Sequence, residues 1–164
     1  MMRIGIIGYG KMGHEIEKIA LKKGYQIIFK INSKNKKILN KKTLSKIDVA
    51  IDFSTPNSAF QNIKMCITNR TPIISGTTGW LHQLDEVREL CVKYKSSFLH
   101  APNFSIGMNL FFEINNYIAK LMNDKNYRIL IEEKHHTMKK DTPSGTAIKI
   151  QNDIYKHNKE KIKT

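Results

Sequence analysis

The sequence predicts an α/β protein in which a parallel sheet flanked by helices is followed by a smaller, partial α+β domain. Short apolar runs alternate with segments of helical periodicity over about the first hundred residues, and a glycine-rich turn separates the first run from the first helical segment. The pattern changes after about residue 105, where a long apolar-rich helical segment begins. We therefore expect one domain over residues 1–104 and a second over residues 105–164.

The first strand and the first helix are expected on either side of a turn that contains Gly8, Gly10 and Gly13. Residues 2–7 have the composition of a buried strand, and the apolar residues between 12 and 21 recur at helical spacing. In this context Gly8 permits the tight turn, Gly10 lets the backbone approach a pyrophosphate, and Gly13 allows the helix to pack closely on the strand. The pattern favours a Rossmann-type dinucleotide-binding domain; the alternative is a glycine-rich turn that serves packing alone.

The rest of the first domain continues the alternation. Further strands are expected over residues 25–31, 47–53, 71–75 and 97–100, and further helices over residues 58–67 and 84–94. A lysine-rich loop follows the second strand, and three strands run into small or hydroxylated residues. Because ligands of an open parallel sheet lie beyond the carboxyl ends of its strands, we expect these loops to line one cleft.

The second domain is expected to contain two helices and one strand. The helices are predicted over residues 108–122 and 146–155, and the strand over residues 128–133. Ser144 has the residue type and the place of a helix N-cap.

The segment from Glu132 to Ala147 combines groups that bind and protonate an anion. A histidine side chain can act as a general acid at physiological pH, while lysines and the amides at a helix N-terminus attract carboxylates or phosphates. A metal site is the alternative for His135 and His136. Adjacent residues of a strand point to opposite faces, and no further ligand motif accompanies the two histidines, so we expect no metal.

Composition restricts the function classes. The formal net charge of +14 raises nucleic acid as a partner, but the lysines are scattered and are not interleaved with aromatic residues, so we expect none. No run of about 18 apolar residues and no signal peptide is visible, which predicts no membrane span. Cys66 and Cys91 each lie among apolar residues at helical spacing, as buried free thiols do, and a cytoplasmic location fits them.

The chain resembles the bacterial dihydrodipicolinate reductases over nearly all of its length. The resemblance is carried by residues 8–13, 52–56, 76–79 and 101–109, and most specifically by the segment from Glu133 to Thr146, which contains both histidines, Lys139 and Ser-Gly-Thr. It implies NADPH- or NADH-dependent reduction of 4-hydroxy-tetrahydrodipicolinate to tetrahydrodipicolinate in lysine and diaminopimelate biosynthesis.

The resemblance also implies site residues. His135 would be the general acid and Lys139 its essential partner, and the substrate carboxylates would be held by His136, Ser144, Gly145 and Thr146. The expected cofactor residues are Gly8, Gly10, Lys11, Met12, Gly13, Asn32, Phe53, Ser54, Gly76, Thr78, Ala101, Asn103 and Phe104.

Two departures from the family pattern leave alternatives open. The second strand ends at Asn32, where this fold usually carries an acidic residue for the adenosine ribose. Family members normally continue past the position of Thr164 with strands that complete the second domain and build a homotetramer, so we expect the C-terminal part of that domain to be missing. The alternatives to the enzyme are an inactive remnant that only binds nucleotide and a basic RNA-associated protein.

Overall fold

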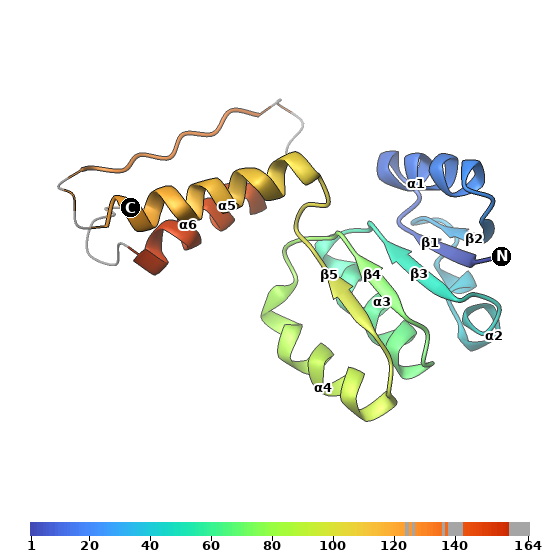
Figure 1. The fold of residues 1–164 in the computed structure, drawn as a ribbon. Coiled ribbons are helices and arrows are strands. Elements are labelled where there is room, and N and C mark those ends of the chain that lie inside the picture. The colour runs from blue at the N-terminus through green and yellow to red at the C-terminus, as the bar shows by residue number, and fades with distance from the viewer. Residues whose placement is uncertain (124, 126, 136, 138–142, 158–164) are drawn as a thin grey trace. The chain divides into compact units, whose positions relative to one another are not determined.

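A computed structural model describes residues 1–123, 125, 127–135, 137 and 143–157. The chain divides into two compact units, Met1–Ala101 and Pro102–Thr164 (Figure 1). The first unit contains all five strands of the described chain, and the described helices of the second unit are α5 and α6.

The first unit is built on a parallel sheet with the strand order β2-β1-β3-β4-β5. Its strands are β1 (Arg3–Ile7), β2 (Gln26–Ile31), β3 (Val49–Asp52), β4 (Ile73–Ser75) and β5 (Phe98–His100). The connecting helices are α1 (Lys11–Lys22), α3 (Pro56–Thr68) and α4 (Leu84–Tyr94), with a short 3-10 turn, η2 (Leu81–Gln83), before α4. The predicted α/β fold class is confirmed. The chain leaves β1 toward β2 and then returns to the other side of β1 as β3, which places the topological switch point at β1 and β3.

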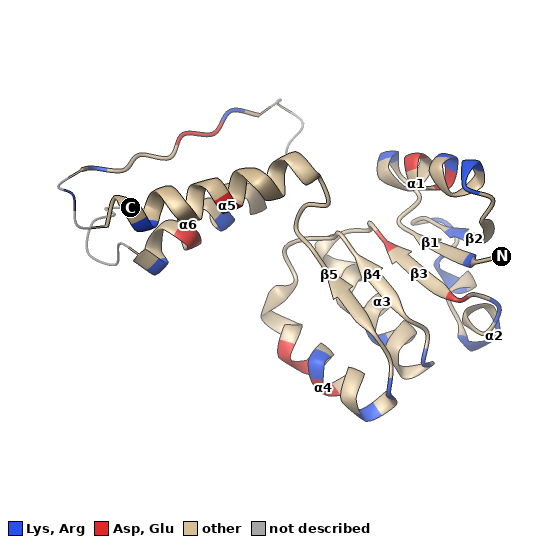
Figure 2. Ribbon diagram, viewed as in Figure 1, with Lys and Arg blue, Asp and Glu red and all other residues tan. Residues whose placement is uncertain are grey.

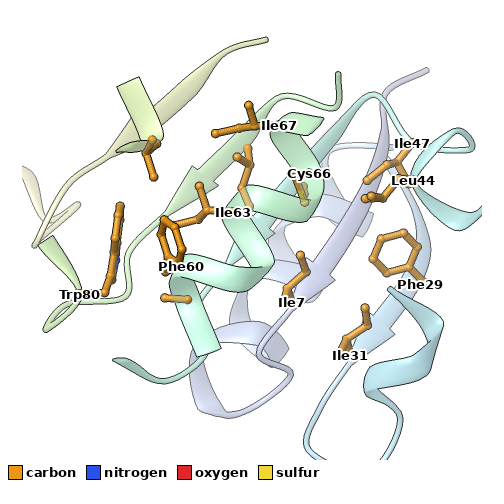
Figure 3. Packing of buried hydrophobic residues seen from close by; sticks show 14 residues of the cluster. Ile7, Phe29, Ile31, Leu44, Ile47, Phe60, Ile63, Cys66, Ile67 and Trp80 are labelled. Carbon is orange, nitrogen blue, oxygen red and sulfur yellow. The ribbon is translucent and has the colours of Figure 1, made fainter. Parts of the chain in front are cut away.

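Each face of this sheet has its own core. Ile4 and Ile6 of β1 pack with Ala20 of α1 on one face, whereas Ile7 belongs to the larger cluster on the other face. This division follows from the alternation of side chains along a strand. The larger cluster contains Ile63 and Ile67 of α3 together with Trp80, and all three side chains are fully buried (Figure 3).

An irregularity in β2 assigns its apolar side chains to both cores. The pairing of β1 with β2 shifts register between Ile4 and Gly5, so that Ile27 lies with the α1 core and Phe29 with the α3 core, although both have the same parity in the sequence. The ring of Phe29 fills the space beside Gly5, where a Cβ atom would lie 2.3 Å from it.

The lysine-rich loop after β2 is partly helical, which differs from the prediction. It contains the 3-10 turn η1 (Lys36–Ile38) and the short helix α2 (Lys41–Leu44). Asn40 and Thr43 form a capping box at the start of α2, and Leu44 is buried in the α3 core. A single buried leucine and a local cap leave too short a periodic signal to be recognised in the sequence.

The second unit pairs α5 (Ile106–Leu121) with α6 (Gly145–His157). Phe112 and Ala119 of α5 and Ala147 and Ile154 of α6 are buried. The N-caps are Ser105, whose Oγ accepts a hydrogen bond from the amide of Met108, and Ser144, whose Oγ accepts one from the amide of Ala147 at 3.0 Å. The predicted role of Ser144 as an N-cap agrees with this geometry.

The predicted strand over residues 128–133 is wrong. These residues have no regular secondary structure and run as a non-helical segment beside α5 (Figure 1). A strand requires a neighbouring strand to accept and donate its backbone hydrogen bonds, and the described part of the second unit contains none. The segment instead lies over α5 and α6, where Ile129 and Leu130 line an apolar groove with Ile118 and Ile154.

Candidate functional site

The carboxyl ends of β1, β2 and β3 in the first unit open into one cleft of about 330 Å³. This is the switch point of the sheet, where open α/β folds place their ligands. The lining contains five of the residues that the sequence assigns to the cofactor, namely Gly8, Gly10, Asn32, Phe53 and Ser54. The remaining cofactor candidates of this unit, which are Lys11, Met12, Gly13, Gly76, Thr78 and Ala101, do not line it.

The three glycines of the first turn have different surroundings. Gly8 has φ +89°, and a Cβ atom there would lie 2.1 Å from the carbonyl oxygen of Phe53. At Gly13 a Cβ atom would lie 2.8 Å from the carbonyl oxygen of Gly8, so this glycine allows α1 to approach the turn closely. At Gly10 no atom lies within 4 Å of such a Cβ atom. The fold itself therefore requires Gly8 and Gly13, whereas the open space at Gly10 is available to a ligand.

The N-terminus of α1 is suited to an anion. Gly10 is its N-cap residue, no side chain caps it, and its first turn contains no acidic residue. The amides of the first turn carry the positive end of the helix dipole, and they are the groups that bind pyrophosphate in dinucleotide-binding folds.

A buried carboxylate joins the loops that follow β3 and β4. Asp52 is fully buried, and its Oδ2 accepts hydrogen bonds from the hydroxyls of Ser75 at 3.0 Å and Thr77 at 2.7 Å. Its Oδ1 accepts a hydrogen bond from the side-chain amide of Asn62 at 3.1 Å, and the same amide nitrogen lies 3.2 Å from the Oγ of Ser54. Asp52 thereby fixes the backbone on which Phe53 and Ser54 face the cleft.

This network was missed in the sequence. Its signal is a lone carboxylate at the end of an otherwise apolar strand, followed by hydroxyl residues at the ends of two neighbouring strands. Gly76 adjoins it: a Cβ atom at Gly76 would lie 2.2 Å from the ring of Phe53, so the glycine makes room for that ring.

His100 is the last residue of β5 and lies at the same edge of the sheet. Its Nε2 lies 3.2 Å from the carbonyl oxygen of Thr77, which also accepts a hydrogen bond from Nε1 of Trp80 at 2.7 Å. Burial lowers the pKa of His100, so the ring is neutral at neutral pH. Because a carbonyl oxygen can only accept, Nε2 of His100 is the donor.

Asn32 directly follows β2 and lines the cleft. Its backbone amide donates to Oδ1 of Asn35 at 2.7 Å, and its own Oδ1 accepts from the amide of Lys34 at 2.9 Å. Of the three lysines that follow Asn32 most closely, Lys36 lines the cleft and Lys34 and Lys37 do not.

The second unit places Glu133, His135 and Ser144 in one cluster at the N-terminus of α6. Glu133 accepts hydrogen bonds from the amide of Ser144 at 2.9 Å, from its hydroxyl at 2.5 Å and from Nε2 of His135 at 2.8 Å. The Ser144 hydroxyl, and after it His135, hold the pKa of Glu133 at about 2. Among the described residues, no acceptor is bonded to the amides of Gly145 and Thr146, the first two residues of α6. These amides can donate hydrogen bonds to a bound anion.

The other predicted site residues have different placements. His136 and Lys139 lie outside the described residues. Asn103 and Phe104 belong to the second unit, where Oδ1 of Asn103 accepts a hydrogen bond from the amide of Ser105 at 2.8 Å and Phe104 is exposed.

The basic residues are distributed over several elements (Figure 2). Part of the positive charge is paired on the surface, as in the contacts of Arg3 with Asp48 at 2.6 Å and of Lys64 with Glu86 at 2.9 Å. None of the helices that the structure describes is both long enough and apolar enough to cross a membrane.

The parallel sheet and its glycine turn define the first unit as a dinucleotide-binding domain. The family model for the N-terminus of dihydrodipicolinate reductase matches residues 2–104, and the model for its C-terminus matches residues 107–164. The chain belongs to the dihydrodipicolinate reductase family.

Individual relatives agree with this assignment. The 4-hydroxy-tetrahydrodipicolinate reductase of Christiangramia forsetii is 44% identical over 96% of this chain and 65% of its own length. The enzyme of the same name from Archaeoglobus fulgidus is 32% identical over 98% of this chain and 67% of its own length. The solved structure of a dipicolinate-bound dihydrodipicolinate reductase from Paenisporosarcina sp. TG-14 is 27% identical, with a TM-score of 0.76 over the whole chain and 69% of that protein. The chain thus spans about two thirds of the length of these relatives.

Proposed function

We propose that this chain carries out the NADPH- or NADH-dependent reduction of 4-hydroxy-tetrahydrodipicolinate to tetrahydrodipicolinate, within lysine and diaminopimelate biosynthesis. The observation that carries the proposal is the second-unit cluster, which places the imidazole of His135 beside the N-terminus of α6. A proton donor and an anion site are what reduction of an unsaturated dicarboxylate requires. Membership of the family, together with the dinucleotide-binding domain, supports the same conclusion.

The first-unit cleft fits a nicotinamide dinucleotide. The amides at the start of α1 and the open space at Gly10 would receive the pyrophosphate, and Asn32 would face the adenosine ribose. Phe53 and Ser54 would complete the wall, held by the hydrogen bonds of Asp52. The bound dinucleotide supplies a hydride to an unsaturated carbon of the substrate.

The second unit would bind the substrate and provide the proton. The amides of Gly145 and Thr146 would bind one carboxylate, and we infer from the family motif that His136 and Lys139 help to bind the substrate. After loss of the 4-hydroxyl group as water, the ring is a conjugated imine. Hydride addition to one carbon leaves an electron pair on the conjugated system. His135, or a water that it orients, would protonate that position, and Lys139 would offset the developing negative charge.

Two measurements test the proposal. The first is NADPH and NADH binding to the purified chain by calorimetry, and the second is oxidation of the reduced cofactor, followed by absorbance, in the presence of 4-hydroxy-tetrahydrodipicolinate. We expect binding and substrate-dependent oxidation. Binding without oxidation would support the nucleotide-binding remnant instead, and absence of both would refute the assignment of the cleft.

A further inference from the structure

Glu133 is the central residue of the second-unit cluster, because both Ser144 and His135 donate hydrogen bonds to it. One of its oxygens accepts from the amide of Ser144, and the other accepts from the Ser144 hydroxyl and from Nε2 of His135. Ser144 is only 5% exposed, whereas the side chain of His135 is 39% exposed, so the contact of Glu133 with Ser144 is the more shielded of the two. The carboxylate therefore connects the imidazole to the N-cap of α6.

The charge of Glu133 determines which nitrogen of His135 is available. Its donors hold the pKa of Glu133 at about 2, so the group is an anion at neutral pH and can only accept hydrogen bonds. Nε2 of His135 must then be the donor in the 2.8 Å contact. The nitrogen that remains for other partners is Nδ1.

The hydroxyl of Ser144 is also engaged in hydrogen bonds. It donates its hydrogen to Glu133 at 2.5 Å and accepts from the amide of Ala147 at 3.0 Å. The amide of Ser144 is bound to Glu133 as well. Within the described part of the chain the amides of Gly145 and Thr146 have no acceptor, so they are the donors that a carboxylate at α6 would meet, whereas Ser144 serves the cap.

We propose that Glu133 is a positioning residue of the reductase: it ties His135 to the N-cap of α6 and leaves Nδ1 of the imidazole as the nitrogen that exchanges protons with the substrate. This inference rests on the proposed function. An anion is specifically needed, because two carboxylate oxygens accept three hydrogen bonds here, whereas glutamine has one acceptor oxygen and would oppose an N–H donor with another.

The chain offers a matched control for this residue. Glu132 is the adjacent acid, its side chain is 69% exposed, and it forms an ion pair with Lys134 at 3.4 Å. Glu132→Ala removes the same charge from the same segment and leaves the His135 contact intact. Glu133→Ala removes roughly the volume of an acetate ion, so added acetate can occupy the vacated position.

The experiment compares the full chain as wild type, Glu132→Ala and Glu133→Ala. In Glu133→Ala we expect turnover to fall about 10-fold to 100-fold, the scale for removing a group that orients a functional histidine, with an unchanged dissociation constant for NADPH. Sodium acetate, compared with sodium chloride at equal ionic strength, should restore part of the activity in Glu133→Ala and have no effect on Glu132→Ala. If Glu133→Ala does not fold, Glu133→Gln takes its place and should lose activity in the same direction.

A second readout does not depend on turnover. The ring nitrogen signals of His135, assigned by their loss in His135→Gln, should shift in Glu133→Ala, return toward wild type with acetate, and stay unchanged in Glu132→Ala. If the wild type does not turn over the substrate, the proposed function fails and these signals alone decide the contact. Unchanged ring signals in Glu133→Ala, wild-type turnover, or a loss that acetate does not restore would each overturn the positioning role.

Discussion

Gly10 allows the binding role of the first turn to be separated from its structural role. A Cβ atom at Gly10 meets no atom within 4 Å, and the backbone there is extended with φ −103°. Replacing Gly10 with alanine or valine should therefore change the free energy of unfolding by no more than about 0.5 kcal/mol, as at other surface positions. The matched control is Gly8→Ala, where φ is +89° and the new Cβ atom would lie 2.1 Å from the Phe53 carbonyl oxygen. The backbone conformation alone costs about 1–3 kcal/mol at that position, and the clash adds to it.

A substitution at Gly10 should weaken cofactor binding, although it leaves the free energy of unfolding nearly unchanged. A branched side chain at Gly10 would occupy the space in front of the first-turn amides of α1 and keep a pyrophosphate from reaching them. Loss of one charge-assisted hydrogen bond costs about 1.5–3 kcal/mol, which corresponds to about 10-fold to 100-fold weaker binding. We expect Gly10→Val to lose at least this much affinity and Gly10→Ala to lose less.

Two measurements on each variant decide the question. Chemical denaturation gives the free energy of unfolding, and titration calorimetry with NADPH and NADH gives the dissociation constants. A well-folded Gly10→Val chain that binds both cofactors within about twofold of wild type would show that no phosphate approaches this turn. A Gly8→Ala chain as stable as wild type would contradict the close contact with Phe53.

Three further predictions concern the chemistry. His135→Ala and Lys139→Ala should each lower turnover by about 100-fold or more with little effect on cofactor affinity, and near-normal steady-state rates in either variant would remove that residue from the mechanism. Asn32 lacks the charge that repels a 2′-phosphate, and Lys36 lines the same cleft, so the wild type should prefer NADPH by about tenfold, or about 1.4 kcal/mol. Asn32→Asp should move the ratio of the dissociation constants for NADPH and NADH toward NADH, and an unchanged ratio would refute the argument. Because the hydroxyl of Ser144 and the imidazole of His135 lower the pKa of Glu133 from 4.5 to about 2, the stability that this anion contributes is present above pH 4.5 and is lost as the pH falls toward 2. The difference in urea midpoint between wild type and Glu133→Gln should shrink over that interval, and a difference independent of pH would contradict the assignment.

The parts of the fold that the sequence predicted correctly depend on local patterns. The first strand, the glycine turn and α1 were recognised because burial, backbone freedom and helical spacing all leave their marks within about twenty residues of chain. The cap at Ser144 was predicted for the same reason, since its partner Ala147 is three residues away. The incorrectly predicted strand over residues 128–133 has suitable residues, but strand formation depends on a neighbour that local sequence does not specify.

The candidate site was predictable only where its residues follow a known motif. His135 and Ser144 lie in such a motif, whereas the link between them through Glu133 spans eleven residues of sequence and depends on how the segment folds back onto α6. Asp52 is a similar case, because its partners Ser75 and Thr77 come from the end of β4 and the loop after it. In both cases a carboxylate organises donors that are distant in sequence, and periodicity contains no information about such pairs.

The hydrogen bonds of Asp52 have a consequence for the dynamics of the cleft. The buried carboxylate of Asp52 accepts hydrogen bonds from hydroxyls at the end of β4 and in the loop after it, and from a side-chain amide of α3. If the loop after β3 or the loop after β4 opened, these donors or the carboxylate itself would lose their hydrogen bonds. The amides of Ser54 and Thr77, which donate to hydroxyls of the same network, should therefore exchange with solvent deuterium at a common rate, as one cooperative unit. A wall that is already ordered in the empty protein loses little conformational entropy when a ligand arrives, so this part of the cleft should bind with a small entropic penalty.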